Sequence, residues 1–311
     1  MATDIKSPVL VTGAHRTGTT WVGKILAASA TLTYISEPLN VLHRPGVMHV
    51  PTPCWYTYIC AENESDYLEA LKETLEFRYH LWEEIKALRS IKDFLRMGRD
   101  LFSFVAGGIF RRTPLIKDPF AVFSISWFIQ RFSSRVLVVV RHPAAFASSL
   151  VRLGWNFDFR HLLAQPLLMR DYLNPFREEM NACLGRPDDI ISQAALLWRM
   201  IYQAVRLQTL QHPEIIIVRH EDLSIDPVQG FREIFQTIEL PFTPRVENSI
   251  RRTSSGANPV EISPKRVHSI RLDSRANLGN WKRRLTEKEI QRIHEVTSDV
   301  VSYYYSEQSW H

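Results

Sequence analysis

The sequence predicts an α/β fold of three layers, in which a central parallel sheet is flanked by helices. Two observations carry this prediction. Short apolar runs typical of buried strands alternate with longer segments whose apolar residues repeat at helical spacing. The run Arg135–Val140 is almost purely apolar, as expected for a parallel strand covered on both faces. We expect four to five strands in one domain over residues 1–311, because no internal repeat or low-complexity linker interrupts the chain.

The composition is that of an ordinary globular protein. The 311 residues are 45% hydrophobic and 23% charged, which is ample for a core. A net charge of +5 suits an anionic ligand but is too mild and dispersed to indicate nucleic acid. Three cysteines without metal spacing favour a reduced, cytoplasmic setting. No signal peptide precedes residue 8, and the longest apolar run, residues 101–110, is shorter than the ~18–20 residues of a membrane span, so we expect none.

The first predicted strand, residues 8–12, leads into a loop suited to hold a phosphate. Residues 13–20 have the GxxxxG spacing of a P-loop, between a strand and a helix that begins at Thr19. Glycines let successive backbone N–H groups point inward, and the helix N-terminus adds its positive dipole end. Thr19 stands where a Walker motif has lysine, while Arg16 offers a guanidinium. The loop therefore indicates an anionic nucleotide and argues against ATP or GTP hydrolysis.

The string Arg-Thr-Gly-Thr-Thr-Trp at residues 16–21 resembles the 5′-phosphosulfate loop of the P-loop sulfotransferases. The pattern is closest to their carbohydrate branch. The resemblance implies 3′-phosphoadenosine 5′-phosphosulfate (PAPS) as the co-substrate, with no metal. It assigns donor contacts in this loop to His15, Arg16, Thr17, Gly18, Thr19, Thr20 and Trp21. A glycine-containing turn without a ligand is the alternative interpretation.

The second strand, within residues 31–40, ends at Glu37-Pro38. Ligands of parallel α/β sheets bind at this carboxyl edge, and Pro38 stops the strand. The string Ser-Glu-Pro-Leu resembles the carbohydrate branch, where a glutamate before proline is implicated as the general base. A structural salt bridge at the strand end is the alternative role for Glu37.

A third strand, within residues 112–119, ends in Lys117-Asp118-Pro119. It resembles the strand of cytosolic sulfotransferases in which a lysine contacts the transferring group and a histidine two residues later is the base. Pro119 occupies the histidine position here, which favours Glu37 as the base. The expected catalytic residues are therefore Glu37, Lys117 and Arg16, and a mere surface cation is the alternative for Lys117. His43, in a loop of residues 43–53 expected to line the acceptor pocket, is the next candidate base.

The fourth strand, Arg135–Val140, runs into a segment that resembles the family's 3′-phosphate motif. Arg141 leaves the strand end, and Ser149 follows about two helical turns later. The resemblance assigns both to the 3′-phosphate, with His142 in place of the usual aspartate. After a fifth strand at residues 214–218, His220 stands where the family has a tyrosine near the adenine. Arg275 is the best-supported donor contact in a late segment, residues 275–282, which the family closes over the donor.

The remaining segments carry weaker signals. Residues 62–90 and 188–211 have helical apolar spacing, and residues 101–110 are expected to be buried or to line an acceptor groove. Residues 152–186 are a candidate for acceptor choice. Residues 242–275 look loop-rich and basic. Thr286 and Glu289 form a capping-box pattern that opens the last helix.

The function expected from these features is sulfuryl transfer from PAPS to an acceptor hydroxyl, of a carbohydrate or a related small molecule. The reaction is an in-line displacement at sulfur with Glu37 as general base. A nucleotide kinase-like phosphotransferase is one alternative, but it needs a Walker lysine and Mg²⁺ ligands. A catalytically silent nucleotide-binding protein is the other, and the pair Glu37 and Lys117 argues against it.

Overall fold

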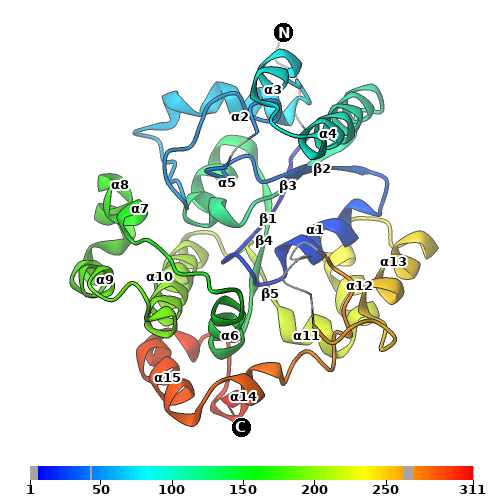
Figure 1. Cartoon of the computed structure of the whole chain (residues 1–311). Coiled ribbons are helices and arrows are strands. Elements are labelled where there is room, and N and C mark those ends of the chain that lie inside the picture. The colour runs from blue at the N-terminus through cyan, green and yellow to red at the C-terminus, as the bar shows by residue number, and fades with distance from the viewer. Residues whose placement is uncertain (1–5, 43, 262–268, 311) are drawn as a thin grey trace.

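A five-stranded parallel sheet forms the centre of the molecule in the computed structural model, which describes residues 6–42, 44–261 and 269–310 (Figure 1). The strand order is β2-β3-β1-β4-β5. All five strands that the sequence predicts are present, so the expectation of a parallel α/β fold is confirmed. Their bounds are β1 Val9–Thr12, β2 Leu32–Ser36, β3 Thr113–Lys117, β4 Arg135–Val140 and β5 Ile216–Arg219.

Helices cover both faces of the sheet. Alternate strand residues point to opposite faces, so Leu10 and Val138 join one apolar cluster, and Val11 and Val139 join the other. Figure 1 shows α1, α12 and α13 beside one face and α5, α6 and α10 beside the other. The longer helices are α1 Thr19–Ala27, α4 Ile91–Ile109, α5 Ile125–Phe132, α6 Pro143–Leu153, α10 Ile190–Gln211, α12 Pro227–Thr237, α13 Pro244–Ser254 and α15 Glu287–Val301.

Short helical segments fill the connections between these elements. The α-helical ones are α2 Leu68–Leu75, α3 Leu81–Ala87, α7 Arg160–Leu163, α8 Pro166–Leu168, α9 Arg177–Leu184, α11 His220–Ile225 and α14 Asn280–Arg284. Short 3₁₀ helices lie at Glu64–Asp66, Pro119–Ser124, Asn174–Phe176 and Glu307–Trp310, and a π-helical turn lies at Met169–Leu173. The capping box predicted at Thr286 and Glu289 opens α15.

Residues 62–90, where the sequence has helical apolar spacing, are largely helical but do not form one continuous helix. The chain forms a 3₁₀ turn, then α2 and α3, with Phe77 at a left-handed φ of 61° between the two helices. The rings of Phe77 and Tyr79 pack edge-on against Phe104 of α4, with centroids 6.1 and 5.4 Å away. This packing against a distant helix outweighs the local helical spacing.

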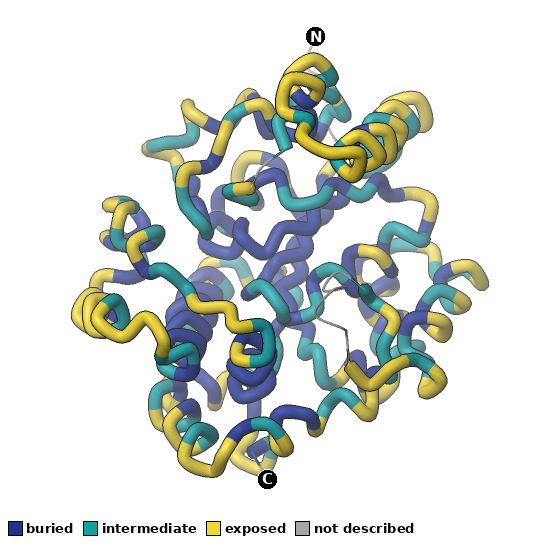
Figure 2. The backbone as a smooth tube through the Cα atoms, viewed as in Figure 1, coloured by how far each residue is buried: buried dark blue, intermediate teal, exposed yellow. Residues whose placement is uncertain are grey.

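Two further expectations need correction. Residues 101–110 belong to α4, and their large apolar side chains are mainly exposed instead of buried: Phe102 is 76% and Ile109 71% exposed. Figure 2 shows this outer face of α4 in yellow beside the dark, buried sheet. The segment 242–275 is not simply a loop, because Pro244–Ser254 forms α13, capped by the Thr243 side chain; its residues 262–268 lie outside the described part. Among the described residues, no helix is both long and apolar enough to cross a membrane.

Candidate active site

The carboxyl ends of the parallel strands place the predicted residues at one edge of the sheet. Ser36 pairs with Lys117 across β2 and β3, and Val11 pairs with Lys117 across β1 and β3. Glu37 therefore follows β2 beside the last residue of β3, and the loop of residues 13–20 follows β1 next to both. On the other side, Val140 pairs with Arg219, so the residues after β4 and β5 share the same edge.

The loop after β1 approaches its neighbours so closely that two glycines are required. Gly13 has φ +136°, and a Cβ there would lie 2.3 Å from the Val139 carbonyl oxygen. Gly18 has φ +103°, and a Cβ there would lie 2.6 Å from Cδ2 of His220. Between them Arg16 adopts φ 68°, a left-handed conformation unusual for a residue with a side chain. The loop is thus a strained, tightly packed turn at the start of α1.

Two buried tyrosines hold the first half of this loop. The Ala14 N–H donates to the Tyr202 hydroxyl at 3.3 Å, and Tyr202 donates in turn to the Val139 carbonyl at 2.8 Å. The His15 N–H donates to the Tyr56 hydroxyl at 3.1 Å. These N–H groups are engaged within the protein, as is the Thr17 N–H, which donates to the Ala14 carbonyl at 3.3 Å. We therefore expect a phosphate cradle in the second half of the loop, Arg16 to Thr20, without a contribution from the Thr17 N–H.

A cavity opens in front of that second half. Its lining brings together many of the residues predicted from sequence: Arg16, Gly18, Thr19, Thr20, Trp21, Arg141 and His220. Sequence reasoning missed the opposite wall, which is rich in hydroxyl and amide groups: Ser224, Thr253, Ser269, Ile270, Leu272, Ser274 and Asn277. The indole N–H of Trp21 donates to Thr253 Oγ1 at 3.0 Å and so joins α1 to this wall.

Positive charge concentrates in an adjoining cavity. Arg16 and Arg141 line both cavities, and Ser149 lines the second one. Arg16 Nε donates to Ser149 Oγ at 3.4 Å, and Arg141 Nη1 donates to the Arg16 carbonyl at 3.2 Å. Burial, with Arg141 and Arg152 nearby, lowers the pKa of Arg16 to about 10. Like charges held together in a buried place indicate a site for an anion.

Two arginines of this charged cavity were not predicted. Arg152 lies three residues after Ser149 on α6, which puts both on one helix face. Arg284, at the end of α14, donates to Ser148 Oγ at 3.3 Å and pairs with Glu261. The spacing from Ser149 could have identified Arg152, whereas nothing local connects Arg284 to the site.

Glu37 and Lys117 form an ion pair at the edge of the sheet. Lys117 Nζ donates to Glu37 Oε1, the Glu37 N–H donates to the Lys117 carbonyl at 2.9 Å, and Asn40 Nδ2 donates to Glu37 Oε2 at 2.7 Å. Glu37 adopts a left-handed φ of 51°. The Lys117 side chain is 3% exposed and that of Glu37 26% exposed, so the carboxylate is the solvent-facing partner.

The surroundings of Lys117 keep its ammonium charged and in place. Burial lowers its pKa, but Tyr34 and Glu37 together shift it above the ordinary value. The aliphatic part of the Lys117 side chain packs against α1 at Gly23, where a Cβ would lie only 3.0 Å from Lys117 Cγ. The alternative that Lys117 is a surface cation is therefore wrong.

The neighbouring Asp118 was not singled out from the sequence. Its two carboxylate oxygens accept hydrogen bonds from the Leu39 N–H at 2.6 Å and the Phe120 N–H at 2.9 Å. Burial, with Glu37 nearby, raises the pKa of Asp118 to about 7. Asp118 joins the end of β3 to the segment that follows Glu37, and its position before Pro119 is the local signal of such a cap.

His15 lies within the loop and His220 packs against it at Gly18, and both are half-buried. The Tyr56 hydroxyl lies 2.6 Å from His15 Nδ1, and burial, with Arg16 nearby, lowers the pKa of His15 to about 4. His220 packs edge-on against Trp21 with centroids 6.0 Å apart, and burial, then Arg141, lowers its pKa to about 3. Both imidazoles are therefore neutral at pH 7.

Three predicted donor residues, His15, Thr17 and Arg275, line neither cavity. The buried Thr17 hydroxyl donates to the Ala14 carbonyl at 2.7 Å and so closes the loop on itself. Arg275 is exposed, and its Nε donates to the Ile225 carbonyl at 2.7 Å, while its neighbours Ser274 and Asn277 line the first cavity. The late segment thus reaches the site through these two neighbours. His43 lies outside the described residues.

Comparisons with known proteins identify the family of the chain. A family model described as a sulfotransferase domain matches residues 6–305. Carbohydrate sulfotransferase 2 from Mus musculus and from Homo sapiens are each 28% identical over 202 residues, which cover 58% of this chain and 34% of those proteins. The match thus spans about a third of the length of these curated relatives.

Two solved sulfotransferase structures resemble the chain at low sequence identity. Mouse SULT7A1 in complex with PAP is 11% identical, with a TM-score of 0.48 and coverage of 97% of this chain and 86% of that chain. STF9 from Mycobacterium avium is 14% identical, with a TM-score of 0.48 and coverage of 98% and 78%.

Proposed function

The chain belongs to the sulfotransferase domain family, and from this membership we propose that it transfers a sulfuryl group from PAPS to the hydroxyl of a carbohydrate or a related small molecule. The observation that carries the proposal is the Glu37–Lys117 ion pair beside the glycine-containing loop at the carboxyl edge of the sheet. It combines a solvent-facing carboxylate with a buried cation next to the expected phosphate cradle.

We assign the donor to the two adjoining cavities. The 5′-phosphosulfate lies against the second half of the loop, Arg16 to Thr20, at the N-terminus of α1. The 3′-phosphate lies in the charged cavity of Arg141 and Ser149, where it relieves the repulsion between the arginines. These cations neutralise the donor without a metal ion.

The proposed reaction is a direct displacement at sulfur. The acceptor oxygen forms a bond to sulfur while the bond from sulfur to the 5′-phosphate oxygen breaks on the opposite side. The acceptor proton passes to the Glu37 carboxylate, and the electron pair of the broken bond leaves with adenosine 3′,5′-bisphosphate (PAP). Arg16 and Lys117 stabilise the negative charge that moves onto the leaving phosphate, and the product is a sulfate ester.

Glu37 is a better base for this step than the nearest histidine. His15 is neutral at pH 7, but the Tyr56 hydroxyl lies 2.6 Å from its Nδ1, and the residue lines neither cavity. Glu37 faces solvent, and its Oε2 lies near Asn40 while Oε1 contacts Lys117. The carbohydrate class of acceptor is supported by the Ser-Glu-Pro-Leu string and by the resemblance to carbohydrate sulfotransferase 2.

The test of the proposal is the variant Glu37→Gln, assayed for kcat and for PAP affinity. We expect kcat to fall by ~10²-fold or more, since general-base catalysis contributes ~10²–10⁴ in rate, while the PAP Kd stays within a few-fold. The matched control is Glu239→Gln, because Glu239 is an exposed glutamate with a similar left-handed φ of 55°. Full turnover in Glu37→Gln would exclude Glu37 as the base.

A further inference from the structure

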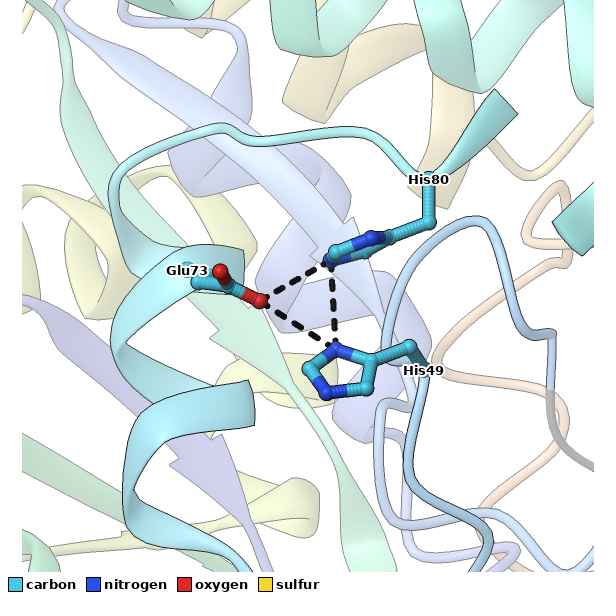
Figure 3. A group of neighbouring side chains, drawn as sticks. All are labelled: His49, Glu73 and His80. Carbon is cyan, nitrogen blue, oxygen red and sulfur yellow. Dashed lines mark hydrogen bonds and ion pairs between the residues drawn. The ribbon is translucent and has the colours of Figure 1, made fainter. Parts of the chain in front are cut away.

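Three side chains that could bind a metal converge on the segment that follows the proposed base. His49 comes from the loop after β2, Glu73 from α2, and His80 from the residue before α3. Figure 3 shows the two imidazole rings and the carboxylate pointing toward a common centre. The sequence shows no metal spacing here, because the three residues lie on separate segments that only the fold brings together.

The distances within this cluster match those of a metal site. His49 Nδ1 and His80 Nε2 are 3.2 Å apart, and each lies 3.2 Å from Glu73 Oε2. Ligand atoms at about 2.0–2.2 Å from a tetrahedral zinc ion are separated by about 3.3–3.6 Å. One cation at the centre of this triangle would therefore reach all three atoms with only small side-chain adjustments.

Backbone hydrogen bonds hold the three segments in place independently of any metal. The His80 N–H donates to the Gly46 carbonyl at 2.9 Å, and the Thr74 hydroxyl donates to the Val47 carbonyl at 2.7 Å. The first bond fixes His80 against the loop that carries His49, and the second fixes the residue next to Glu73 against the same loop. The ligands are thus pre-positioned, which reduces the entropy lost on binding.

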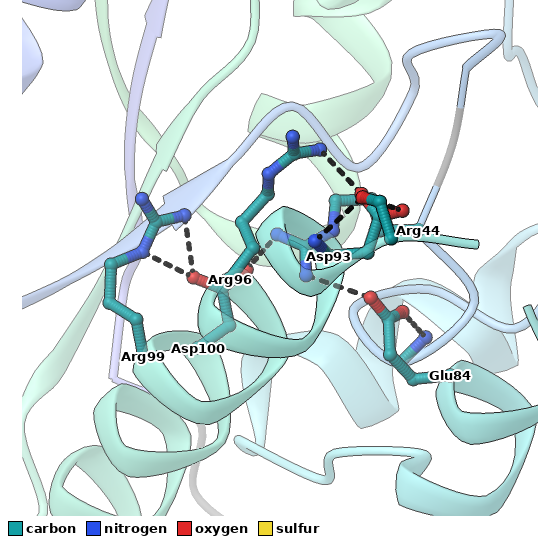
Figure 4. Close-up of polar contacts among 8 residues, drawn as sticks. Arg44, Glu84, Asp93, Arg96, Arg99 and Asp100 are labelled. Carbon is teal, nitrogen blue, oxygen red and sulfur yellow. Dashed lines mark hydrogen bonds and ion pairs between the residues drawn. The ribbon is translucent and has the colours of Figure 1, made fainter. Parts of the chain in front are cut away.

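A charged network reinforces the same loop from the other side. Arg44 pairs with Glu84 of α3 at 2.8 Å and with Asp100 of α4, and Glu84 also accepts a hydrogen bond from the Gly46 N–H at 2.8 Å (Figure 4). Arg78 Nη1 lies 3.6 Å from Glu73 Oε1, the carboxylate oxygen that faces away from the histidines. Glu73 therefore offers Oε2 as a single ligand atom, oriented by a second contact.

We propose that His49, Glu73 and His80 bind a zinc ion, with water in the fourth position. Two imidazoles and one carboxylate are ligands that zinc prefers, and three protein ligands leave one coordination position open. The side chains are 36%, 28% and 26% exposed respectively, so an ion and a water molecule have access from solvent. The ion links the loop after β2 to α2 and α3, and it takes no part in the displacement at sulfur.

The experiment uses the full chain without a polyhistidine tag, stripped with chelator and kept reduced. Zn²⁺ is titrated in competition with a chromophoric chelator. Wild type is expected to bind one equivalent with micromolar or tighter Kd, and His49→Gln and His80→Gln are expected to bind at least ~30-fold more weakly. The matched control is His212→Gln, since His212 also lies beside a glutamate, Glu214 at 3.3 Å, but belongs to no three-ligand cluster among the described residues.

Melting temperatures show whether the variants still fold. Without metal, all four proteins should melt within about 2 °C of one another, and saturating Zn²⁺ should raise the Tm of wild type and of His212→Gln but not of the other two. The same wild-type affinity in the double variant His49→Gln/His80→Gln would assign the ion to other groups, such as the cysteines, and overturn the proposal. Failure of wild type to bind Zn²⁺ would mean that the cluster is only a hydrogen-bonded set.

Discussion

At the scale of single residues, His142 stands out because its ring is buried among aromatic side chains. The imidazole stacks on Trp281 with centroids 5.1 Å apart and meets the edges of Tyr305 and Trp310. Within the described residues, neither ring nitrogen has a hydrogen-bond partner. Burial, with Lys282 nearby, lowers the pKa of His142 to about 3. The protein therefore keeps this histidine neutral across the physiological range.

This burial makes stability depend on pH in a predictable direction. Below its ordinary pKa of 6.5 the unfolded chain binds a proton at His142, while the folded chain does not until about pH 3. Stability is therefore lost as pH falls from about 6.5 toward 3, by about 2 kcal/mol at pH 5. We expect His142→Phe to lose less stability than wild type, by about this amount, between pH 7.5 and pH 5 in urea denaturation. Equal losses in the two proteins would contradict the assignment.

A site residue could be predicted from the sequence when it lies close to the end of a recognisable strand. Arg16, Lys117 and Arg141 each stand at the end of an apolar strand, so the parallel topology alone brings them to one edge. Arg284 comes from a helix remote in sequence, and His80 becomes a neighbour of His49 only through the packing of two loops. Such contacts between distant segments leave no pattern in a single sequence.

At the scale of elements, the loop after β1 and the start of α1 act as one unit. Gly18 ends the loop with a left-handed φ, and α1 begins at the next residue, Thr19. The ring of His220 from α11 packs against this glycine, so α11 fixes how α1 begins. A side chain at position 18 would disturb both contacts.

The matched pair Gly18→Val and Gly154→Val separates backbone strain from loss of the cradle. Both glycines have left-handed φ, but a Cβ at Gly154 would meet nothing within 4 Å, whereas one at Gly18 meets His220 at 2.6 Å. We expect each variant to lose about 1 kcal/mol or more of stability. Only Gly18→Val should lose PAP affinity, by at least 100-fold in isothermal titration. Normal PAP binding by Gly18→Val would show that this loop is not the cradle.

The elements themselves were predictable to different degrees. The five strands are short apolar runs bounded by loop residues. This is the sequence pattern that strands of a buried parallel sheet typically have. Helices at the periphery were harder, because their ends are set by contacts with other elements. The turn at Phe77 depends on a ring of α4, and α13 is a polar helix whose apolar stripe is narrow, with Val246 and Ile250 as its buried apolar residues.

At the scale of the whole molecule, the first cavity is assembled from segments far apart in the chain. Residues 16–21 form one wall, Arg141 and His220 follow β4 and β5, and residues 269–277 close the opposite side. A ligand that fills the cavity therefore contacts the N-terminal, central and C-terminal thirds of the chain together. Binding should consequently stabilise the fold as a whole.

Ligand-dependent melting tests this arrangement. PAP at about 100 times its Kd should add about 2.7 kcal/mol to the free energy of unfolding and raise the Tm by several degrees. AMP at the same concentration should have a smaller effect, because it lacks the phosphate that the Arg141 cavity would hold. ATP with Mg²⁺ should have little effect, since Thr19 replaces the Walker lysine. A larger shift with ATP and Mg²⁺ than with PAP would favour the phosphotransferase alternative.

The left-handed backbones of Arg16 and Glu37 have a consequence for engineering. Each holds a long side chain in a conformation that glycine or asparagine adopts more readily, at about 1 kcal/mol or more of folding free energy. Selection of variants for heat tolerance alone will therefore enrich glycine and asparagine at position 16. At position 37 the same change would leave the buried Lys117 ammonium without its carboxylate partner, which costs more than the strain that it relieves. The replacement at position 16 also removes the guanidinium that we propose contacts the donor. Under the proposed function, thermostability and donor binding are thus opposed at position 16, and a library meant to improve both should keep Arg16 fixed.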